Sequence, residues 1–191
     1  MIGLIVLIAL SIGLATLLNV RVEKTIPFAV LSIITVVYTA GLSNRMNWAI
    51  WIILTITLGL LIYGIIKQKI RRSIISEGLW GFIVVYLISE IQHKYSFPST
   101  WDEKAQWALT VRWSYVTNTL GAIQGSNCYY ADYPPASACF HYFFDKVGFG
   151  YSDSKLYVSM TMLMFAFLVP VLANPIIRKS RLKSIIVTIA L

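Results

Sequence analysis

Apolar residues occupy the chain in long, nearly uninterrupted runs, and most charged residues stand between these runs. Four runs cover residues 2–20, 25–42, 47–66 and 74–91, and a fifth covers residues 156–173. Each is close to the length of about 20 mostly apolar residues that a helix needs to cross a bilayer. A sixth run begins at Ser184 and extends to Leu191. The pattern predicts an all-α integral membrane protein with about five to six transmembrane helices.

The longest polar interval separates the fourth run from the fifth and divides the chain into three parts. Residues 1–91 form four N-terminal transmembrane helices, and residues 92–154 form a loop that is too long for a simple connector. Residues 155–191 form a further transmembrane helix and the start of another span, as expected of a chain cut within a helix.

Charge predicts which side of the membrane this loop occupies. The sequence is 58% hydrophobic with a formal net charge of +8, and ten of its basic residues fall in alternate loops. By the positive-inside rule these loops are cytoplasmic, and only Glu23 and Glu77 oppose them there. We therefore expect a multi-pass cell-membrane protein whose N-terminus and loop 92–154 are extracytoplasmic. The predicted topology accounts for the whole positive charge, so a nucleic-acid partner is not needed to explain it. We therefore expect the lipid bilayer as a partner and no nucleic acid. The ten basic residues are Arg21, Lys24, Lys67, Lys69, Arg71, Arg72, Arg178, Lys179, Arg181 and Lys183.

Two helices are predicted within the loop. Thr100 and Glu103 have the spacing of a capping box, which predicts a helix start there. Polar residues recur every three or four positions over residues 103–117, with aromatic residues on the opposite side. This pattern predicts a helix along the membrane interface with its aromatic side toward lipid. A second helix is predicted over residues 136–147, ending at Gly148. It carries four aromatic side chains, a composition that predicts a surface facing the membrane.

The loop also carries the candidate chemistry. Asp102, Glu103 and Asp132 are three of the eight acidic residues, and an ionised carboxylate can act as a general base. Lys104 and Arg112 could bind a phosphate, which arginine can hold through two hydrogen bonds. The alternative for the adjacent acids is helix capping, and for Asp132 a turn before the prolines.

The cysteines and histidines of the chain give no metal pattern. Cys128 and Cys139 lie in the same loop, where a disulfide could persist, but Cys139 could equally be a small buried apolar residue. His93 and His141 lack a second histidine or cysteine at the spacing of metal ligands. No cofactor is indicated, and a divalent metal is not indicated either.

Taken together, the loop motifs resemble the first extracytoplasmic loop of the GT-C membrane glycosyltransferases, which use polyprenyl-phosphate sugars. The likeness lies in Asp102-Glu103-x-x-x-Trp107-Ala108, then a spacer, then Tyr133-Pro134-Pro135 before an aromatic-rich helix. Aminoarabinose transferases and protein mannosyltransferases belong to this superfamily. The resemblance covers about residues 90–173 and implies that the two interfacial helices form the floor of an active site.

The resemblance also assigns roles within that floor. It implies that Asp102 is the catalytic carboxylate with Glu103 beside it, and that Pro134 and Pro135 position the second helix. Tyr133, Asp132, Lys104 and Arg112 become candidate substrate-binding residues. Three spans precede the loop here, whereas one is usual in the family, and the family has many later spans. The chain is therefore expected to be the N-terminal part of such an enzyme or an inactive remnant.

A second interpretation stays open. The loop could bind glycan or lipid through its Trp and Tyr residues in a non-catalytic membrane protein or a subunit of a cell-surface polysaccharide pathway. A transporter is disfavoured, because the charged groups lie in the loop and not in the middle of a span.

Overall fold

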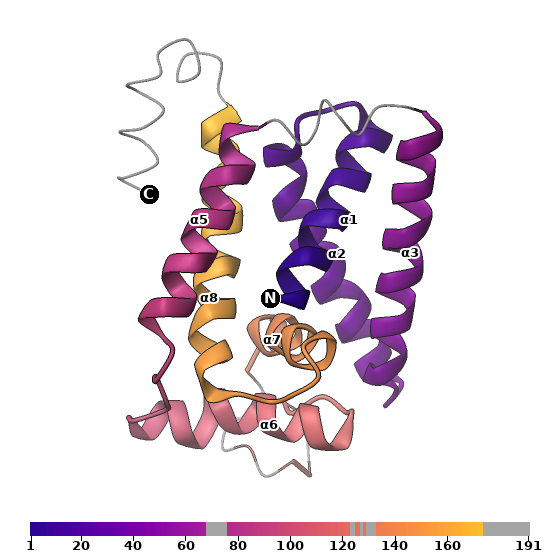
Figure 1. The fold of residues 1–191 in the computed structure, drawn as a ribbon. Helices are drawn as coiled ribbons and strands as arrows, with labels where there is room; N and C mark the ends of the chain where they lie inside the picture. Colours follow the sequence, from indigo (N-terminus) through magenta and orange to yellow (C-terminus); the bar gives the residue numbers. More distant parts are fainter. Residues whose placement is uncertain (68–75, 123–124, 127, 129–132, 174–191) are drawn as a thin grey trace.

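The computed structural model describes residues 1–67, 76–122, 125–126, 128 and 133–173, and the regular structure in these residues is helical. The long helices are α1 (Ile2–Leu18), α2 (Val22–Leu42), α3 (Met46–Ile66), α5 (Glu77–Gln92) and α8 (Asp153–Leu168). They run side by side in alternating directions, and the loop between α5 and α8 folds against one end of them (Figure 1). A 3₁₀ turn, η2 (Val169–Ala173), continues α8 through Pro170, where a helical hydrogen bond is lost.

The prediction of an all-α protein is confirmed for the described residues, and the apolar helices are consistent with a membrane protein. Within the described residues, three helices are long and apolar enough to cross a bilayer: Val22–Leu42, Met46–Ile66 and Asp153–Val171. Helices also occupy the described part of the expected spans at 2–20 and 74–91, but α1 has 17 residues and α5 has 16. The sixth run, the basic cluster at 178–183 and most of the basic cluster at 67–72 lie outside the described residues.

The buried carboxylate of Glu23 links α2 to α5 at the end of the bundle away from the loop. Glu23 is fully buried, and its carboxylate accepts hydrogen bonds from the Arg21 guanidinium at 2.5 Å and from the Gly78 amide at 3.3 Å. A buried carboxylate needs such partners because its charge is costly to remove from water. Gly78 permits the approach, since a Cβ there would stand 2.1 Å from Cγ of Glu23.

The loop supplies a helix that crosses the bundle end and a second helix that fills it. The crossing helix consists of a π-helical turn, η1 (Glu103–Trp107), and α6 (Ala108–Thr117), and it lies across the end of α8 (Figure 1). The second helix, α7 (Ala136–Val147), has the predicted bounds and contacts α1, α2, α3, α6 and α8.

The membrane-facing surface predicted for residues 136–147 is wrong. All four aromatic side chains of α7 are at most 5% exposed and belong to the hydrophobic core: Phe140, Tyr142, Phe143 and Phe144. The aromatic composition instead fills the space enclosed by α1, α2 and α8. Phe144 also packs closely against α1, because a Cβ at Gly3 would meet its ring at 2.8 Å.

The polar side of the crossing helix also faces the protein. Gln106, Thr110 and Ser114 are buried, whereas Trp101 and Trp107 are 57% and 40% exposed. The buried side chains have local partners: the Ser114 hydroxyl accepts a hydrogen bond from the Gly121 amide at 2.9 Å. Small polar groups can be buried at low cost when they are bonded in this way. The predicted division of this helix into two sides is thus present in the structure, with the polar side packed inward.

Candidate functional site

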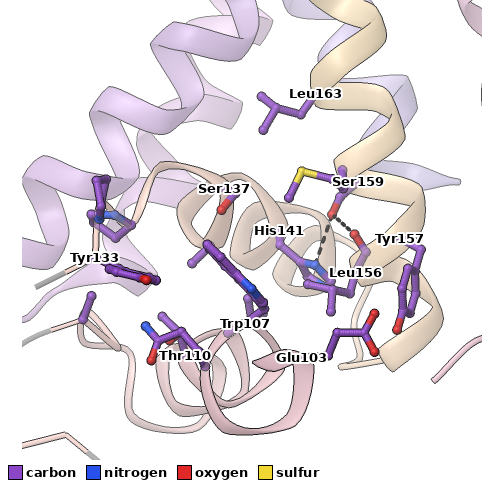
Figure 2. Close-up of a pocket in the computed structure, with 17 residues that line it drawn as sticks. Glu103, Trp107, Thr110, Tyr133, Ser137, His141, Leu156, Tyr157, Ser159 and Leu163 are labelled. Atoms are coloured by element: carbon purple, nitrogen blue, oxygen red, sulfur yellow. Dashed lines mark hydrogen bonds between the residues drawn. The ribbon is translucent and has the colours of Figure 1, made fainter. Parts of the chain in front are cut away.

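A cavity of about 190 Å³ lies where the crossing helix, α7 and the first turns of α8 meet. Its walls are mostly apolar, with a few polar side chains that point inward from different helices. Figure 2 shows Glu103 and Trp107 on one side, His141 and Ser159 on another, and Tyr133 beyond Trp107. An apolar cavity with a small number of convergent polar groups is the usual form of a ligand-binding site.

A π-helical turn at the start of the crossing helix forms the wall of the cavity that contains Glu103. The predicted capping box forms: the Thr100 amide donates to Oε2 of Glu103 at 3.1 Å, and the Glu103 amide donates to the Thr100 hydroxyl at 3.4 Å. The chain then winds as a π-helical turn over Glu103–Trp107 before α6 begins. Single π turns inside helices are rare and occur often at functional sites. Here the turn contributes Glu103, Gln106 and Trp107 to the cavity wall.

The electrostatics of Glu103 favour its ionised form. Its Oε2 accepts hydrogen bonds from the backbone amides of Ser99 at 2.7 Å and Thr100 at 3.1 Å. These two bonds hold the pKa of the Glu103 carboxyl below its ordinary value, and the hydroxyl of Tyr157 adds a smaller effect in the same direction. Glu103 therefore presents a negative charge to a cavity whose other walls are largely apolar.

Asp102 occupies a different position, although it is the neighbouring residue. Its side chain is exposed, and it is not one of the residues that line the cavity. Of the two adjacent carboxylates that the sequence offered, the structure places only Glu103 on the cavity wall.

The proline motif forms the opposite wall. Tyr133, Pro134 and Pro135 all line the cavity, and the rings of Tyr133 and Trp107 contact each other with their centroids 5.8 Å apart. The motif residues that are far apart in the sequence are thus brought together across one space. Asp132, the remaining acidic candidate, lies outside the described residues.

The two candidate phosphate-binding cations lie apart from this cavity. Lys104 and Arg112 line a second pocket of about 190 Å³, together with Tyr151 and Asp153. The Arg112 guanidinium lies 5.3 Å from the centre of the Tyr151 ring, and the Tyr151 hydroxyl donates to Asp153 at 2.7 Å. The structure therefore groups the two cations as a pair, on a different face of the helix from Glu103.

The two cysteines are free thiols, so the disulfide alternative is wrong. Cys128 accepts a hydrogen bond from the Thr110 hydroxyl at 3.3 Å, whereas Cys139 lies in the core formed by α7 and its neighbours. Burial raises the pKa of the Cys139 thiol to about 12. Cys139 is thus the small buried residue that the second alternative described.

No protein-family model, curated protein or solved structure matches the chain.

Sequence reasoning missed one buried group at the cavity, in which His141 and Ser159 line the wall and Asp145 contacts His141. Oγ of Ser159 lies 3.1 Å from Nδ1 of His141, and Oδ2 of Asp145 lies 3.0 Å from Nε2. The spacing of His141 and Asp145, four residues apart in a predicted helix, was a usable signal for the pair. Nothing in the sequence pattern connects Ser159 to them, because it belongs to a different helix.

Proposed function

We propose that the chain is a membrane glycosyltransferase, or the N-terminal part of one, that transfers a sugar from a polyprenyl-phosphate donor to an extracytoplasmic acceptor. The observation that carries the proposal is the position of Glu103. This carboxylate lines a mostly apolar cavity between two loop helices, opposite Pro134 and Pro135. The GT-C resemblance implies Asp102 as the catalytic carboxylate with Glu103 beside it, and Pro134 and Pro135 as the motif that positions the second helix. The position of Glu103 on the cavity wall favours Glu103 as the base.

The chemistry requires a base and a site for the sugar. In the proposed reaction the acceptor oxygen forms a bond to the anomeric carbon, and the bond from that carbon to the phosphate oxygen breaks. The acceptor proton passes to the Glu103 carboxylate, and the polyprenyl phosphate leaves with the electron pair. The contacting rings of Trp107 and Tyr133 supply a large rigid surface for the sugar.

The donor also has a charged and a lipid part. Lys104 and Arg112 share a pocket beside the crossing helix, and we propose that they attract the phosphate of an approaching donor. Because they do not line the Glu103 cavity, their contribution is to recruit the donor and not to hold the reacting atoms. We expect the polyprenyl chain to remain in the bilayer around the apolar helices.

The test compares two matched variants of neighbouring residues in the membrane-embedded protein. Sugar transfer from a polyprenyl-phosphate donor is measured for Glu103→Gln and Asp102→Asn, beside a thermal unfolding curve for each. Glutamine keeps an oxygen that can accept the capping hydrogen bonds but removes the base, so transfer should fall about 10²–10⁴-fold. Asp102→Asn should retain transfer within about a factor of two, since Asp102 is exposed and lies off the cavity wall.

Two results would contradict this assignment. Loss of transfer in Asp102→Asn alone would place the base at the residue that the resemblance selected and remove Glu103 from that role. If the wild type binds the lipid-linked sugar without transferring it, and Glu103→Gln binds it equally well, the non-catalytic glycan- or lipid-binding function would be favoured. The apolar walls of the cavity are compatible with that second function.

A further inference from the structure

Three buried side chains that the glycosyl-transfer proposal does not use form a continuous chain at the cavity wall. Ser159 of α8 meets His141 of α7, and His141 meets Asp145 one turn farther along α7 (Figure 2 shows the Ser159–His141 contact). Their residues are 3%, 1% and 0% exposed, respectively. Ser159 and His141 both line the cavity, so a ligand in the cavity would reach the hydroxyl and the imidazole together.

The groups around His141 favour one tautomer of its imidazole ring. A carboxylate only accepts hydrogen bonds, so Asp145, 3.0 Å from Nε2, favours a proton on that nitrogen. The distance is that of an ion pair, although the geometry is not that of a directed hydrogen bond. Nδ1 then keeps its lone pair for the Ser159 hydroxyl, whose other acceptor is the Leu156 carbonyl oxygen, also at 3.1 Å.

The charge of Asp145 has a second partner. Nζ of Lys155 lies 3.7 Å from its Oδ1, and the same ammonium group donates to the Gly150 carbonyl oxygen at 2.5 Å. Lys155 thereby places a positive charge beside Asp145 on the side away from His141. In serine-hydrolase triads the third member is a carboxylate that orients the imidazole and stabilises its protonated form. Asp145 can take this role with the two ring nitrogens exchanged, since the serine here faces Nδ1 and the carboxylate faces Nε2.

We propose that Ser159 is a nucleophile toward carboxylic esters, with His141 as its general base and Asp145 as the orienting group. Oγ of Ser159 attacks the ester carbonyl carbon while its proton passes to Nδ1 of His141. The carbon–oxygen bond to the alcohol then breaks, and the alcohol leaves with the proton from His141. Water attacks the acyl-serine, gives its proton to His141, and the regenerated serine recovers that proton as the carboxylic acid departs.

The cavity limits the class of ester. Leu156, Met160 and Leu163 of α8 and Trp107 of the crossing helix make the wall around Ser159 largely apolar. A cavity of this character favours an ester with an apolar acyl or alcohol part, such as a lipid ester, over a highly charged one. The ester would enter at the same end of the apolar bundle where the crossing helix lies.

A purely structural contact between α7 and α8 is the competing explanation, and the cavity supplies a control for it. Ser137 of α7 lines the same cavity, but among the described residues it makes no hydrogen bond to a histidine. If the cavity alone made serines reactive, Ser137 and Ser159 would behave alike. If the His141 contact is responsible, only Ser159 would react.

The test uses a fluorophosphonate probe on the full chain in detergent, with the adduct located by mass spectrometry, and hydrolysis of p-nitrophenyl esters of increasing chain length. Wild-type protein should carry the adduct on Ser159 and none on Ser137, and it should hydrolyse the longer esters preferentially. Ser159→Ala should lose both reactions, and His141→Gln should slow them about 10²–10⁴-fold. Asp145→Asn should lower the rate of hydrolysis as well, since the imidazole loses its orienting charge.

A further variant keeps the proposal testable if removal of the hydroxyl disturbs folding. Ser159→Cys preserves the size and a nucleophile, and its alkylation by iodoacetamide should be faster than that of Ser159→Cys/His141→Gln. Cys128 and Cys139 are present in both variants, so their alkylation is a common background that cancels in the comparison. An adduct on Ser137, no adduct on Ser159 in protein that melts normally, or equal alkylation of the two cysteine variants would overturn the assignment. The probe detects ester chemistry only, so the result is independent of sugar transfer.

Discussion

Replacing Gly121 with alanine tests how closely the segment after α6 packs on the crossing helix. A Cβ at position 121 would stand 2.3 Å from the Thr110 carbonyl oxygen and 2.8 Å from Cγ2 of Thr110. Because one of these atoms belongs to the backbone of α6, the methyl group can be accommodated only if the segment moves away. That movement would also break the hydrogen bond from the Gly121 amide to Ser114.

The expected cost follows from these two effects. Overpacking of a filled site costs about 1–3 kcal/mol, and the loss of a buried hydrogen bond adds about 1 kcal/mol. The sum of about 2–4 kcal/mol corresponds to a fall in unfolding midpoint of about 4–16 °C for a chain of this size, at about 2–4 °C per kcal/mol.

The matched control is the same substitution in α3. Nothing lies within 4 Å of a Cβ at Gly59, which is an exposed helical position. Alanine there should stabilise the protein by about 0.5–1 kcal/mol, because glycine is the poorer helix former. Thermal unfolding of the detergent-solubilised variants, followed by loss of the monodisperse peak in size-exclusion chromatography, measures both. Equal midpoints for Gly121→Ala and Gly59→Ala would refute the close packing of this segment on α6.

Two further predictions concern topology and pH. Ser43 and Lys67 are exposed and lie near opposite ends of α3, so cysteines introduced at these positions should be labelled from opposite sides of the membrane. Ser43→Cys should be accessible from outside intact cells. Labelling of Lys67→Cys from outside would show that the orientation is the reverse. The Glu103 carboxyl has a lowered pKa in the folded state, so its contribution to stability is complete above the ordinary value of 4.5 and is lost as the pH falls through the lower folded value. Unfolding midpoints measured from pH 6 to pH 3 should therefore decline more steeply for the wild type than for Glu103→Gln, and parallel curves would show that the cap contributes nothing.

Local signals in the sequence were reliable, and signals that depend on packing partners were not. The capping box at Thr100 and Glu103 and the bounds of α7 follow from residues close together in the chain, and both are confirmed. The sequence of an aromatic-rich helix, however, shows the same pattern whether the helix packs against lipid tails or against other helices. Only the fold places α7 against α1, α2 and α8.

The site shows the same division. The motif residues around Glu103 and Pro134 were found because each lies in a recognisable local pattern. Lys104 was grouped with Glu103 because they are adjacent in sequence, yet the helix directs them into different pockets. Ser159 carried no signal, since its significance depends on His141, eighteen residues away and on another helix.

The π turn at Glu103–Trp107 has a consequence for comparing this chain with any relative. A π turn holds one residue more than the α turn that it replaces, and one residue corresponds to about 100° of rotation in a helix. A homologous sequence with one residue fewer between Pro98 and Ala108 could superimpose on α6 and still direct its upstream carboxylates about a quarter of a turn away. The number of residues in this short interval, more than their identity, would then distinguish relatives that keep a carboxylate at the cavity from those that have lost it.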